Sequence, residues 1–463
     1  MIEKIMKAVK SGNKKRGRNI TIGAVVGMLV SCTAVMGADN YLWIREDSGA
    51  IEFNTAITND ASGAGGNWNE ANPYSDENIW NADTKTYINN MTLLSTAINI
   101  TADKYVRNAS CALKLSGDLG GVINNSLIMG TDINNAVRES SGIYIYDSSN
   151  VETITNNGLL TASAEGSNGI FNFGTVGTLT NTGSIMGTGL TAGHGIYSVT
   201  PTSLANLTNT GLIAGVASKG EGSGVVYMNT NMETLTNSGL IKGIGSSSGF
   251  GIVFGGMSGT SGSIVNTGLI TGTGTSSSSG IANRATGTLG TITNTGIIYG
   301  EKFAVNNDNA TIGSLNNYGI LAAKTASVIS LYGTITSENN YGLMFKGYSG
   351  NYTAIDYENF GTTTKINEYT VINTKAEGVN KDNITGTGSL KLENGVLTYD
   401  DSIGNPQTEN VSLDKKYILN GITDTLLVST GDNKFNNSVI NGYETAVIFD
   451  GTDSQLTLSG TIV

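Results

Sequence analysis

The central part of the chain alternates apolar and polar positions in a nine-residue phrase that returns every 23 to 32 residues. One copy is Leu207-Thr-Asn-Thr-Gly-Leu-Ile-Ala-Gly215, and a period of this length indicates a solenoid, whose units bury their apolar faces by stacking. Similar phrases begin at Val122, Ile154, Leu179, Leu235, Ile264, Ile292 and Leu315. The asparagine of the phrase recurs, the last time in a decayed copy, as Asn124, Asn156, Asn181, Asn209, Asn237, Asn266, Asn294, Asn317 and Asn340.

A second short apolar run lies between successive phrases at six places, as in Gly142-Ile-Tyr-Ile-Tyr146 and Gly195-Ile-Tyr197. The repeat is rich in Thr, Asn, Gly, Ile and Val, which suit strands and tight turns rather than helices. Strands with the same direction in successive units would pair in parallel, and a coil wound on itself covers their inner face. The sequence therefore predicts an all-β fold, a right-handed parallel β-helix with an N-terminal cap. A hairpin array or propeller blades are the alternatives, but four-stranded blades need about 40 residues each.

Each position of the phrase has an expected role. Alternation directs Leu207, Asn209 and Ile213 to the interior and Thr208 and Thr210 to solvent. The asparagines are expected to stack as a ladder that pairs backbone groups at the bend. The glycines that follow them are expected to supply a positive φ. These glycines are Gly158, Gly183, Gly211, Gly239, Gly268 and Gly296.

Residues 1–37 have the three-part pattern of a secretory signal peptide. A basic segment, Lys4 to Arg18, precedes an uncharged apolar run, and cleavage between Gly37 and Ala38 would place small residues at the required positions. A single membrane-anchoring helix is an alternative, although the run is short for a span. Leu29-Val-Ser-Cys32 also resembles a lipobox, so lipidation at Cys32 remains a second alternative.

The rest of the chain divides into three parts by its repeat content. Residues 38–121 are less repetitive and contain Trp43, Trp68 and Trp80, which indicates an N-terminal cap or head, or alternatively an exposed aromatic binding surface. Residues 122–359 form the repeat β-helix. Residues 360–463 keep some apolar and polar alternation and are expected to continue the coils with longer loops, with truncation at the C-terminus.

Composition narrows the classes of partner. Charged residues make up 14% of the chain and its net charge is −11. Removal of residues 1–37 would leave 19 basic and 36 acidic residues, a net charge of −17. Nucleic-acid binding needs a basic face, so no nucleic-acid partner is expected. Two cysteines exclude a disulfide framework, and stacking must stabilise the fold instead.

The long basic leader, the junction Met36-Gly-Ala-Asp-Asn-Tyr-Leu-Trp43 and the Leu-Thr-Asn-Thr-Gly repeats together resemble the passenger of a Gram-negative autotransporter (type V secretion). The resemblance implies export to the cell surface, outer membrane or medium, with the export machinery and an outer-membrane β-barrel translocator as partners. It also implies adhesion, aggregation or biofilm formation, with a host protein or glycan as ligand. No barrel sequence is present, so truncation is expected; a separate barrel polypeptide or a pseudogene product are alternatives.

Candidate catalytic residues are sparse. Asp47-Ser-Gly49 resembles part of a serine protease motif, but the one histidine, His194, is expected to be an exposed loop side chain. Cys111 is expected to be a small buried residue, and no cofactor or metal site is expected, with a weak calcium ion at Asp400 and Asp401 as the alternative. The prediction is therefore a non-catalytic surface adhesin or structural stalk. A secreted β-helical polysaccharide-degrading enzyme and a lipidated surface protein anchored at Cys32 are the alternatives.

Binding in such a protein is expected in the variable loops between strands, because the strand positions repeat and the loops do not. The loop candidates are Ser140–Asn150, Ser246–Gly249, Ser258–Ser263 and Thr273–Gly280.

Overall fold

The protein is described by a computed structural model, in which every secondary-structure element of the described residues is a β-strand. None of these residues forms a helix long and apolar enough to cross a membrane. The leader, with Cys32, Gly37 and Ala38, lies outside the described residues. The described residues are 43–47, 50–54, 69–70, 80–81, 83–90, 93–96, 109–131, 139–199, 203–228, 232–256, 260–284, 287–346, 364–366, 369–373, 390–400, 406–421, 424–442, 445–451 and 453–463.

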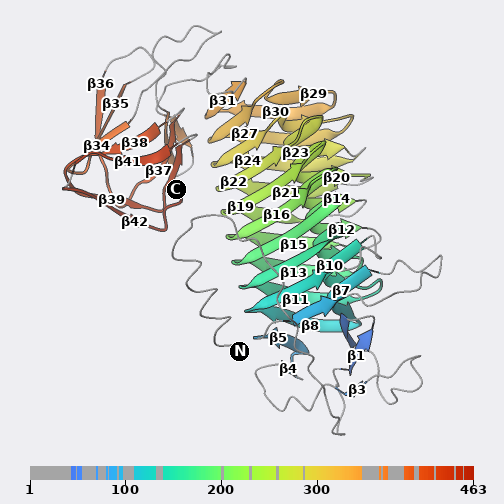
Figure 1. Ribbon diagram of the computed structural model, residues 1–463. Helices are drawn as coiled ribbons and strands as arrows, with labels where there is room; N and C mark the ends of the chain where they lie inside the picture. The colour runs from blue at the N-terminus through green and yellow to red at the C-terminus, as the bar shows by residue number, and fades with distance from the viewer. Residues whose placement is uncertain are drawn as a thin grey trace. The chain divides into compact units, whose positions relative to one another are not determined.

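Three limbs of parallel strands stack coil upon coil (Figure 1), which confirms the predicted parallel β-solenoid. The asparagine limb is one sheet, and each of its strands ends on the asparagine of the repeat. Its strands are β5 (Thr86–Asn89), β8 (Asp118–Asn124), β11 (Asn150–Asn156), β13 (Thr175–Asn181), β15 (Leu204–Asn209), β18 (Thr234–Asn237), β21 (Thr260–Asn266), β24 (Thr288–Asn294), β27 (Thr311–Asn317) and β30 (Thr334–Asn340).

The other two limbs belong to a second sheet, and in two coils a single long strand runs through both of them. The leucine limb comprises β6 (Leu93–Thr96), β9 (Leu127–Thr131), the first parts of β12 (Leu159–Asn172) and β14 (Ser184–Val199), β16 (Leu212–Ala217), β19 (Leu240–Gly245), β22 (Leu269–Thr273), β25 (Ile297–Gly300), β28 (Ile320–Ala323) and β31 (Leu343–Lys346). The glycine limb comprises β2 (Ala50–Asn54), β7 (Ala109–Ser116), β10 (Glu139–Ile145), the second parts of β12 and β14, β17 (Glu221–Met228), β20 (Ser248–Gly255), β23 (Ser277–Arg284), β26 (Phe303–Asn307) and β29 (Ile329–Leu331).

The coils stack in register, so that like residues lie on like residues. Leu207 pairs with Leu235 and Asn209 with Asn237, and in the leucine limb Ile213 pairs with Ile241. Leu207, Asn209 and Ile213 are buried, whereas Thr208 is half-buried and Thr210 is exposed. The expected alternation is therefore present, and its inward apolar columns form one continuous hydrophobic core.

The inward asparagines form a continuous hydrogen-bonded ladder. The Nδ2 of Asn209 donates to the Oδ1 of Asn237 at 2.7 Å, and also to the carbonyl oxygens of Gly211 and Leu240. The same side-chain bond joins each rung to the next at 2.7 to 2.8 Å, from Asn89 to Asn340. Each amide thus satisfies backbone carbonyls at the bend while it fixes the register of its neighbours.

The bend glycines act differently from the expectation. None of Gly158, Gly183, Gly211, Gly239, Gly268 and Gly296 has a positive φ, so that part of the prediction was wrong. A Cβ on Gly211 would instead lie 2.0 Å from the carbonyl oxygen of Gly183 on the coil below. Successive backbones approach so closely at the bend that a side chain has no room, and this close approach is what requires glycine.

A second column of glycines lies where the leucine limb meets the glycine limb. A Cβ on Gly243 would lie 2.0 Å from the carbonyl oxygen of Phe250 and 2.3 Å from that of Gly222. Gly187 and Gly215 occupy the same place in the preceding coils, with equally close carbonyl oxygens. The two limbs therefore pack backbone against backbone at this corner.

Parallel stacking begins before residue 122. The strand β5 pairs in parallel with β8, and β2 pairs in parallel with β7. Antiparallel pairs precede them, with β1 (Trp43–Asp47) against β2 and against β3 (Asn69–Glu70), and β4 (Trp80–Asn81) against β5. The described part of the segment 38–121 thus combines antiparallel strands with the first parallel coils.

The C-terminal part repeats parallel pairing around its own core. The parallel strands are β33 (Tyr369–Asn373), β37 (Lys416–Gly421) and β40 (Val439–Gly442); β34 (Leu390–Glu393), β38 (Asp424–Val428) and β41 (Thr445–Phe449); and β39 (Gly431–Asn436) with β42 (Ser454–Ser459). The antiparallel strands are β32 (Thr364–Ile366), β35 (Val396–Asp400) and β36 (Pro406–Asn410).

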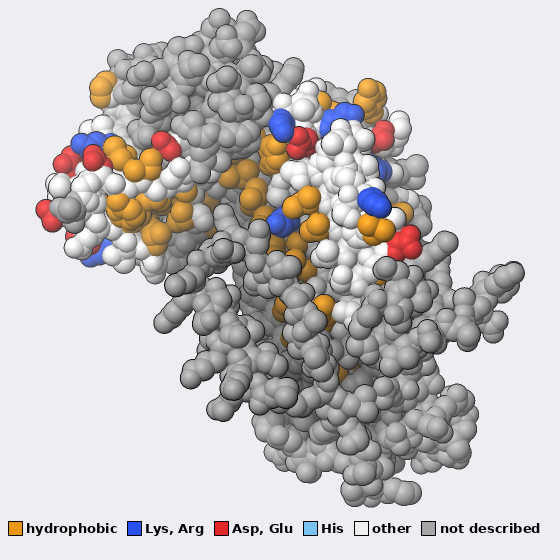
Figure 2. Space-filling model, viewed as in Figure 1, with side chains coloured by type: hydrophobic (Ala, Val, Ile, Leu, Met, Phe, Trp, Pro, Cys, Tyr) orange, Lys and Arg blue, Asp and Glu red, His pale blue; other side chains and the backbone are white. Residues whose placement is uncertain are grey.

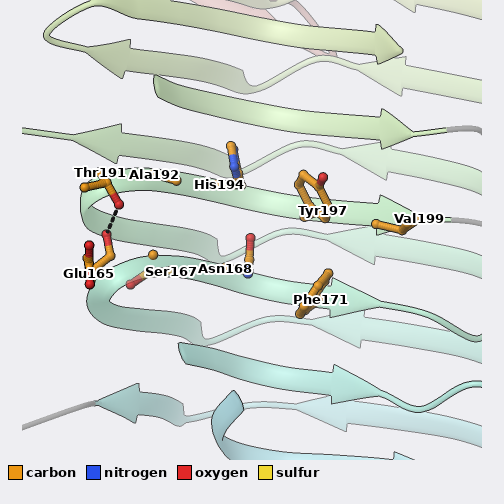
Figure 3. A pocket seen from close by; sticks show the side chains of 10 residues that line it. Glu165, Ser167, Asn168, Phe171, Thr191, Ala192, His194, Tyr197 and Val199 are labelled. Carbon is orange, nitrogen blue, oxygen red and sulfur yellow. Dashed lines mark hydrogen bonds between the residues drawn. The ribbon is translucent and has the colours of Figure 1, made fainter. Parts of the chain in front are cut away.

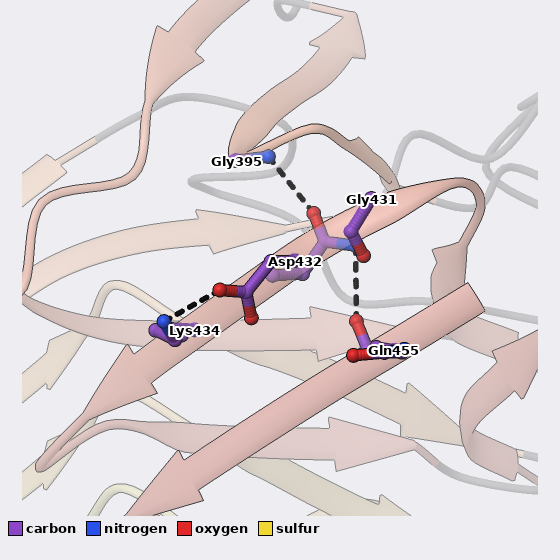
Figure 4. Close-up of polar contacts among 6 residues, drawn as sticks. Gly395, Gly431, Asp432, Lys434 and Gln455 are labelled. Carbon is purple, nitrogen blue, oxygen red and sulfur yellow. Dashed lines mark hydrogen bonds and ion pairs between the residues drawn. The ribbon is translucent and has the colours of Figure 1, made fainter. Parts of the chain in front are cut away.

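Buried asparagines also join segments in this C-terminal part. Asn433 accepts a hydrogen bond from the backbone N–H of Gly395 and donates to the carbonyl oxygens of Gly431 and Gln455. Figure 4 shows these contacts, together with the exposed ion pair between Lys434 and Asp432. On the face shown in Figure 2, charged side chains of the described residues are scattered among uncharged ones.

Candidate ligand-binding site

The outer side of the glycine limb carries an unusual group of side chains on two adjacent coils. Asn168 and Phe171 on β12 are the register partners of His194 and Tyr197 on β14. Ile170 and Ile196 face the core, so the next residues, Phe171 and Tyr197, point to the opposite side of their strands. Figure 3 shows Asn168, Phe171, His194 and Tyr197 projecting from the same side of the two strands.

The composition of this outer side changes along the stack, unlike that of the core. The register position of Phe171 and Tyr197 is occupied by Tyr144 one coil earlier and by Val226 and Val253 on the following coils. The position of Asn168 and His194 is occupied by Ser141, Ser223 and Phe250 on the same coils. The coils that contain β12 and β14 therefore combine aromatic rings with large polar groups.

These side chains line a pocket of about 540 Å³. Its volume falls within the range of roughly 300 to 1,000 Å³ that is typical of small-molecule sites. The lining residues are Glu165, Gly166, Ser167, Asn168, Phe171, Thr191, Ala192, His194, Tyr197 and Val199. At one end the Thr191 hydroxyl donates to the carbonyl oxygen of Glu165 at 3.1 Å, which ties the two coils together (Figure 3).

Aromatic rings form one wall. The rings of Phe171 and Tyr197 meet edge to face, with centroids 5.4 Å apart, and the rings of His194 and Tyr197 are 5.0 Å apart. Phe171 also contacts Tyr144 and Phe173, at 5.6 and 4.6 Å. Such contacts each stabilise a cluster by about 0.5–1.5 kcal/mol beyond area burial, so the wall is held in place before any ligand arrives.

Two polar side chains that project from the outer side of the strands have atoms without a hydrogen-bond partner. They are the Oδ1 of Asn168 and the Nδ1 of His194, whose residues are 5% and 9% exposed. The Oγ of Ser167 is also unpaired, but it lies on the opposite side of β12 (Figure 3). Burial also lowers the pKa of His194 to about 4, so its imidazole is neutral at physiological pH. Buried polar groups are almost always hydrogen-bonded, so two orphaned atoms on adjacent coils of one pocket point to a polar ligand.

His194 was expected to be an exposed loop side chain, and that prediction was wrong. The strand β14 continues through Ala192-Gly-His-Gly195, and His194 is buried. Flanking glycines ordinarily indicate a loop, but here they serve close packing. A Cβ on Gly193 would lie 2.0 Å from the carbonyl oxygen of Val216 on the neighbouring coil.

The buried neutral histidine predicts a pH-dependent stability. Because its folded pKa of about 4 is below the value of 6.5 for an unperturbed histidine, the unfolded chain binds the proton more readily. The stabilisation is complete above about pH 6.5 and is lost as the pH falls towards 4. Between pH 7 and pH 4, wild type should lose up to about 3 kcal/mol more unfolding free energy than His194→Gln.

Urea unfolding at several pH values measures this difference directly. The nearby carboxyl groups, Glu165 in the pocket and Glu221 on the next coil, are present in both proteins, so the comparison isolates the side chain at position 194. Parallel stability curves for wild type and His194→Gln would contradict a buried neutral imidazole.

The described sequence candidates Cys111 and Asp47 do not line the pocket. Cys111 is buried at 3% exposure, as expected. Asp47 lies in β1, whereas Ser48, Gly49 and Asp401 lie outside the described residues. Among the described residues, no group of three or more His, Cys, Asp or Glu side chains is placed to hold a metal ion.

The predicted binding loops are largely strands. Residues 140–145 belong to β10, and Ser140 and Ser141 are buried. The strands β20, β21 and β23 contain residues 248–249, 260–263 and 277–280 of the other three candidates. The pocket instead lies on the outer face of two strands. The feature of the sequence that could have indicated it is the change of residue type from coil to coil at the outward positions.

Family models give no match to this chain, and comparisons with curated proteins and with solved structures give none either.

Proposed function

We propose that this chain is a non-catalytic, surface-displayed passenger of the autotransporter type, which acts as an adhesin on a stiff β-helical stalk. The observation that carries the proposal is the pocket between β12 and β14, with its orphaned polar atoms and its aromatic wall. The asparagine ladder and the continuous core supply the stiff frame that holds this pocket.

Display at the surface is supported by the sequence. The basic leader and apolar run before Gly37 match a signal peptide, and a net charge of −17 for the remainder favours a soluble exported chain. We expect an outer-membrane translocator and the export machinery as partners during secretion. We expect a ligand on a host surface or on neighbouring cells afterwards.

The chemistry of the pocket favours binding over hydrolysis. Glycoside hydrolysis ordinarily needs two carboxyl groups on either side of the scissile bond. Of the described residues that line the pocket, Glu165 alone carries a carboxylate. His194 is neutral and its Nδ1 has no hydrogen-bond partner, so it lacks the orienting acid that a catalytic base uses.

An adhesion assay tests the proposal. Beads coated with the full chain should attach to cultured epithelial cells or clump with one another, and beads coated with heat-unfolded chain should do neither. The same preparation should release no reducing ends from a panel of polysaccharides.

Two results would count against the proposal. Coated beads that neither attach nor clump would remove the adhesive function. Release of reducing ends that is abolished by Glu165→Gln would favour the polysaccharide-degrading alternative.

A further inference from the structure

The pocket requires a ligand that can both donate and accept hydrogen bonds. The Oδ1 of Asn168 can only accept, and the Nδ1 of a neutral imidazole donates or accepts according to its tautomer. A hydroxyl group meets both demands, because it donates one hydrogen and accepts on two lone pairs. A ligand with several hydroxyl groups would satisfy the orphaned atoms together.

The same pocket requires an apolar surface on the ligand. Phe171 and Tyr197 provide aromatic carbon beside the polar atoms, and Tyr197 is half-buried rather than sealed off. Pyranose rings have this double character, since one face consists of C–H groups and the edge carries hydroxyls. A purely polar ligand would make no apolar contact with the aromatic wall, and a purely apolar one would leave the two polar atoms unpaired.

Charge narrows the class of sugar. Among the described lining residues there is no lysine or arginine, and Glu165 contributes a negative charge. On the adjoining coil Glu221, the register partner of Ala192, adds a second one. An anionic sugar would therefore be repelled, whereas a neutral one would not.

We propose that the pocket between β12 and β14 binds a neutral hexose unit of a glycan. The C–H face of the sugar packs on Tyr197 and Phe171, and its hydroxyls bond to Asn168 Oδ1 and His194 Nδ1. The biological meaning of this inference rests on the proposed adhesive function, whereas sugar binding itself is measured independently of it.

Titration calorimetry and saturation-transfer NMR of the full chain with free galactose, glucose, mannose and N-acetylglucosamine test the inference. At least one of these sugars should bind saturably with a Kd of roughly 1 mM, which is typical of a small ligand with few contacts. Tyr197→Ala and Asn168→Ala should each weaken binding at least about 10-fold.

Val253→Ala is the matched control. Val253 occupies the same outward column as Tyr197, two coils further on, and does not line the pocket. The Val253→Ala protein should bind sugar with the same Kd as wild type. Circular dichroism and melting temperature confirm that each variant is folded, and His194→Gln provides a second pocket variant if Asn168→Ala does not fold.

Several outcomes would overturn the inference. They are the absence of binding by all four sugars, binding that Tyr197→Ala and Asn168→Ala leave unchanged, and tighter binding of anionic N-acetylneuraminic acid. Bead adhesion that persists in Tyr197→Ala without sugar binding would overturn this site and leave the adhesive function standing. Sugar binding without bead adhesion would leave the site standing and remove the adhesive function.

Discussion

Replacement of Asn156 by alanine is expected to lower the unfolding free energy by about 3–6 kcal/mol, because several buried groups lose their partners together. Asn156 is fully buried and accepts from Asn124 at 2.7 Å. It donates to the Oδ1 of Asn181 and to the carbonyl oxygens of Gly158 and Ser184. Urea or thermal unfolding followed by circular dichroism measures the loss.

The next residue in the chain supplies the control. Asn157 also takes part in a ladder between coils, donating to Asn125 at 2.8 Å and accepting from Thr182 at 2.9 Å, but these contacts are exposed. Water replaces exposed partners, so Asn157→Ala should change the unfolding free energy by less than about 0.5 kcal/mol. Equal losses for the two variants would show that burial of the inner ladder does not determine its contribution.

Replacement of Gly243 by alanine is the second large expected effect, with a loss of about 3 kcal/mol or more. The new methyl group would meet the carbonyl oxygens of Phe250 and Gly222 at 2.0 and 2.3 Å, and both are backbone atoms that cannot rotate away. The two limbs would have to separate at this corner. Thermal unfolding and the yield of folded protein report the loss.

Lys242→Ala is the neighbouring control, since Lys242 lies in the same strand with its side chain partly exposed. It should change stability by less than about 0.5 kcal/mol. A Gly243→Ala protein as stable as wild type would mean that the two limbs can separate at this corner without loss of unfolding free energy. Close packing of the backbones would then not require glycine at position 243.

The strands and their parallel stacking could be predicted because the repeat places one residue type at each structural position. Leu207, Asn209 and Ile213 have counterparts every 23 to 32 residues, and the inward columns follow from alternation alone. The rung at Asn89 escaped detection because Asn90 and Met91 replace the usual Thr-Gly, and 35 residues separate it from the next rung. In the C-terminal part Asn373, Asn420 and Asn441 form a similar ladder, which intervals of 47 and 21 residues conceal.

The pocket could not be predicted from the repeat because it is formed by residues that differ from one coil to the next. Outward positions do not have to repeat one residue type to fill the core, so Asn168, His194 and Tyr197 share no periodic signal. The glycines around His194 have the composition of a loop, and only the three-dimensional distance to the neighbouring backbone shows why a strand needs them. The prediction of a positive φ at Gly211 was wrong for a related reason. Glycine is required both by turns with a positive φ and by close backbone contacts, so the sequence alone does not distinguish the two.

The asparagine ladder has a consequence for how such a chain can change its length. Rungs are separated by as few as 23 and as many as 35 residues, yet the side-chain bond between them stays at 2.7 to 2.8 Å. The connections therefore absorb most of the difference in length, and the coils present the same inward ladder to their neighbours. Recombination between two copies on the same side of the pocket can add or delete a whole coil, which moves the pocket along the axis in steps of about 4.8 Å while the coils of β12 and β14 stay intact.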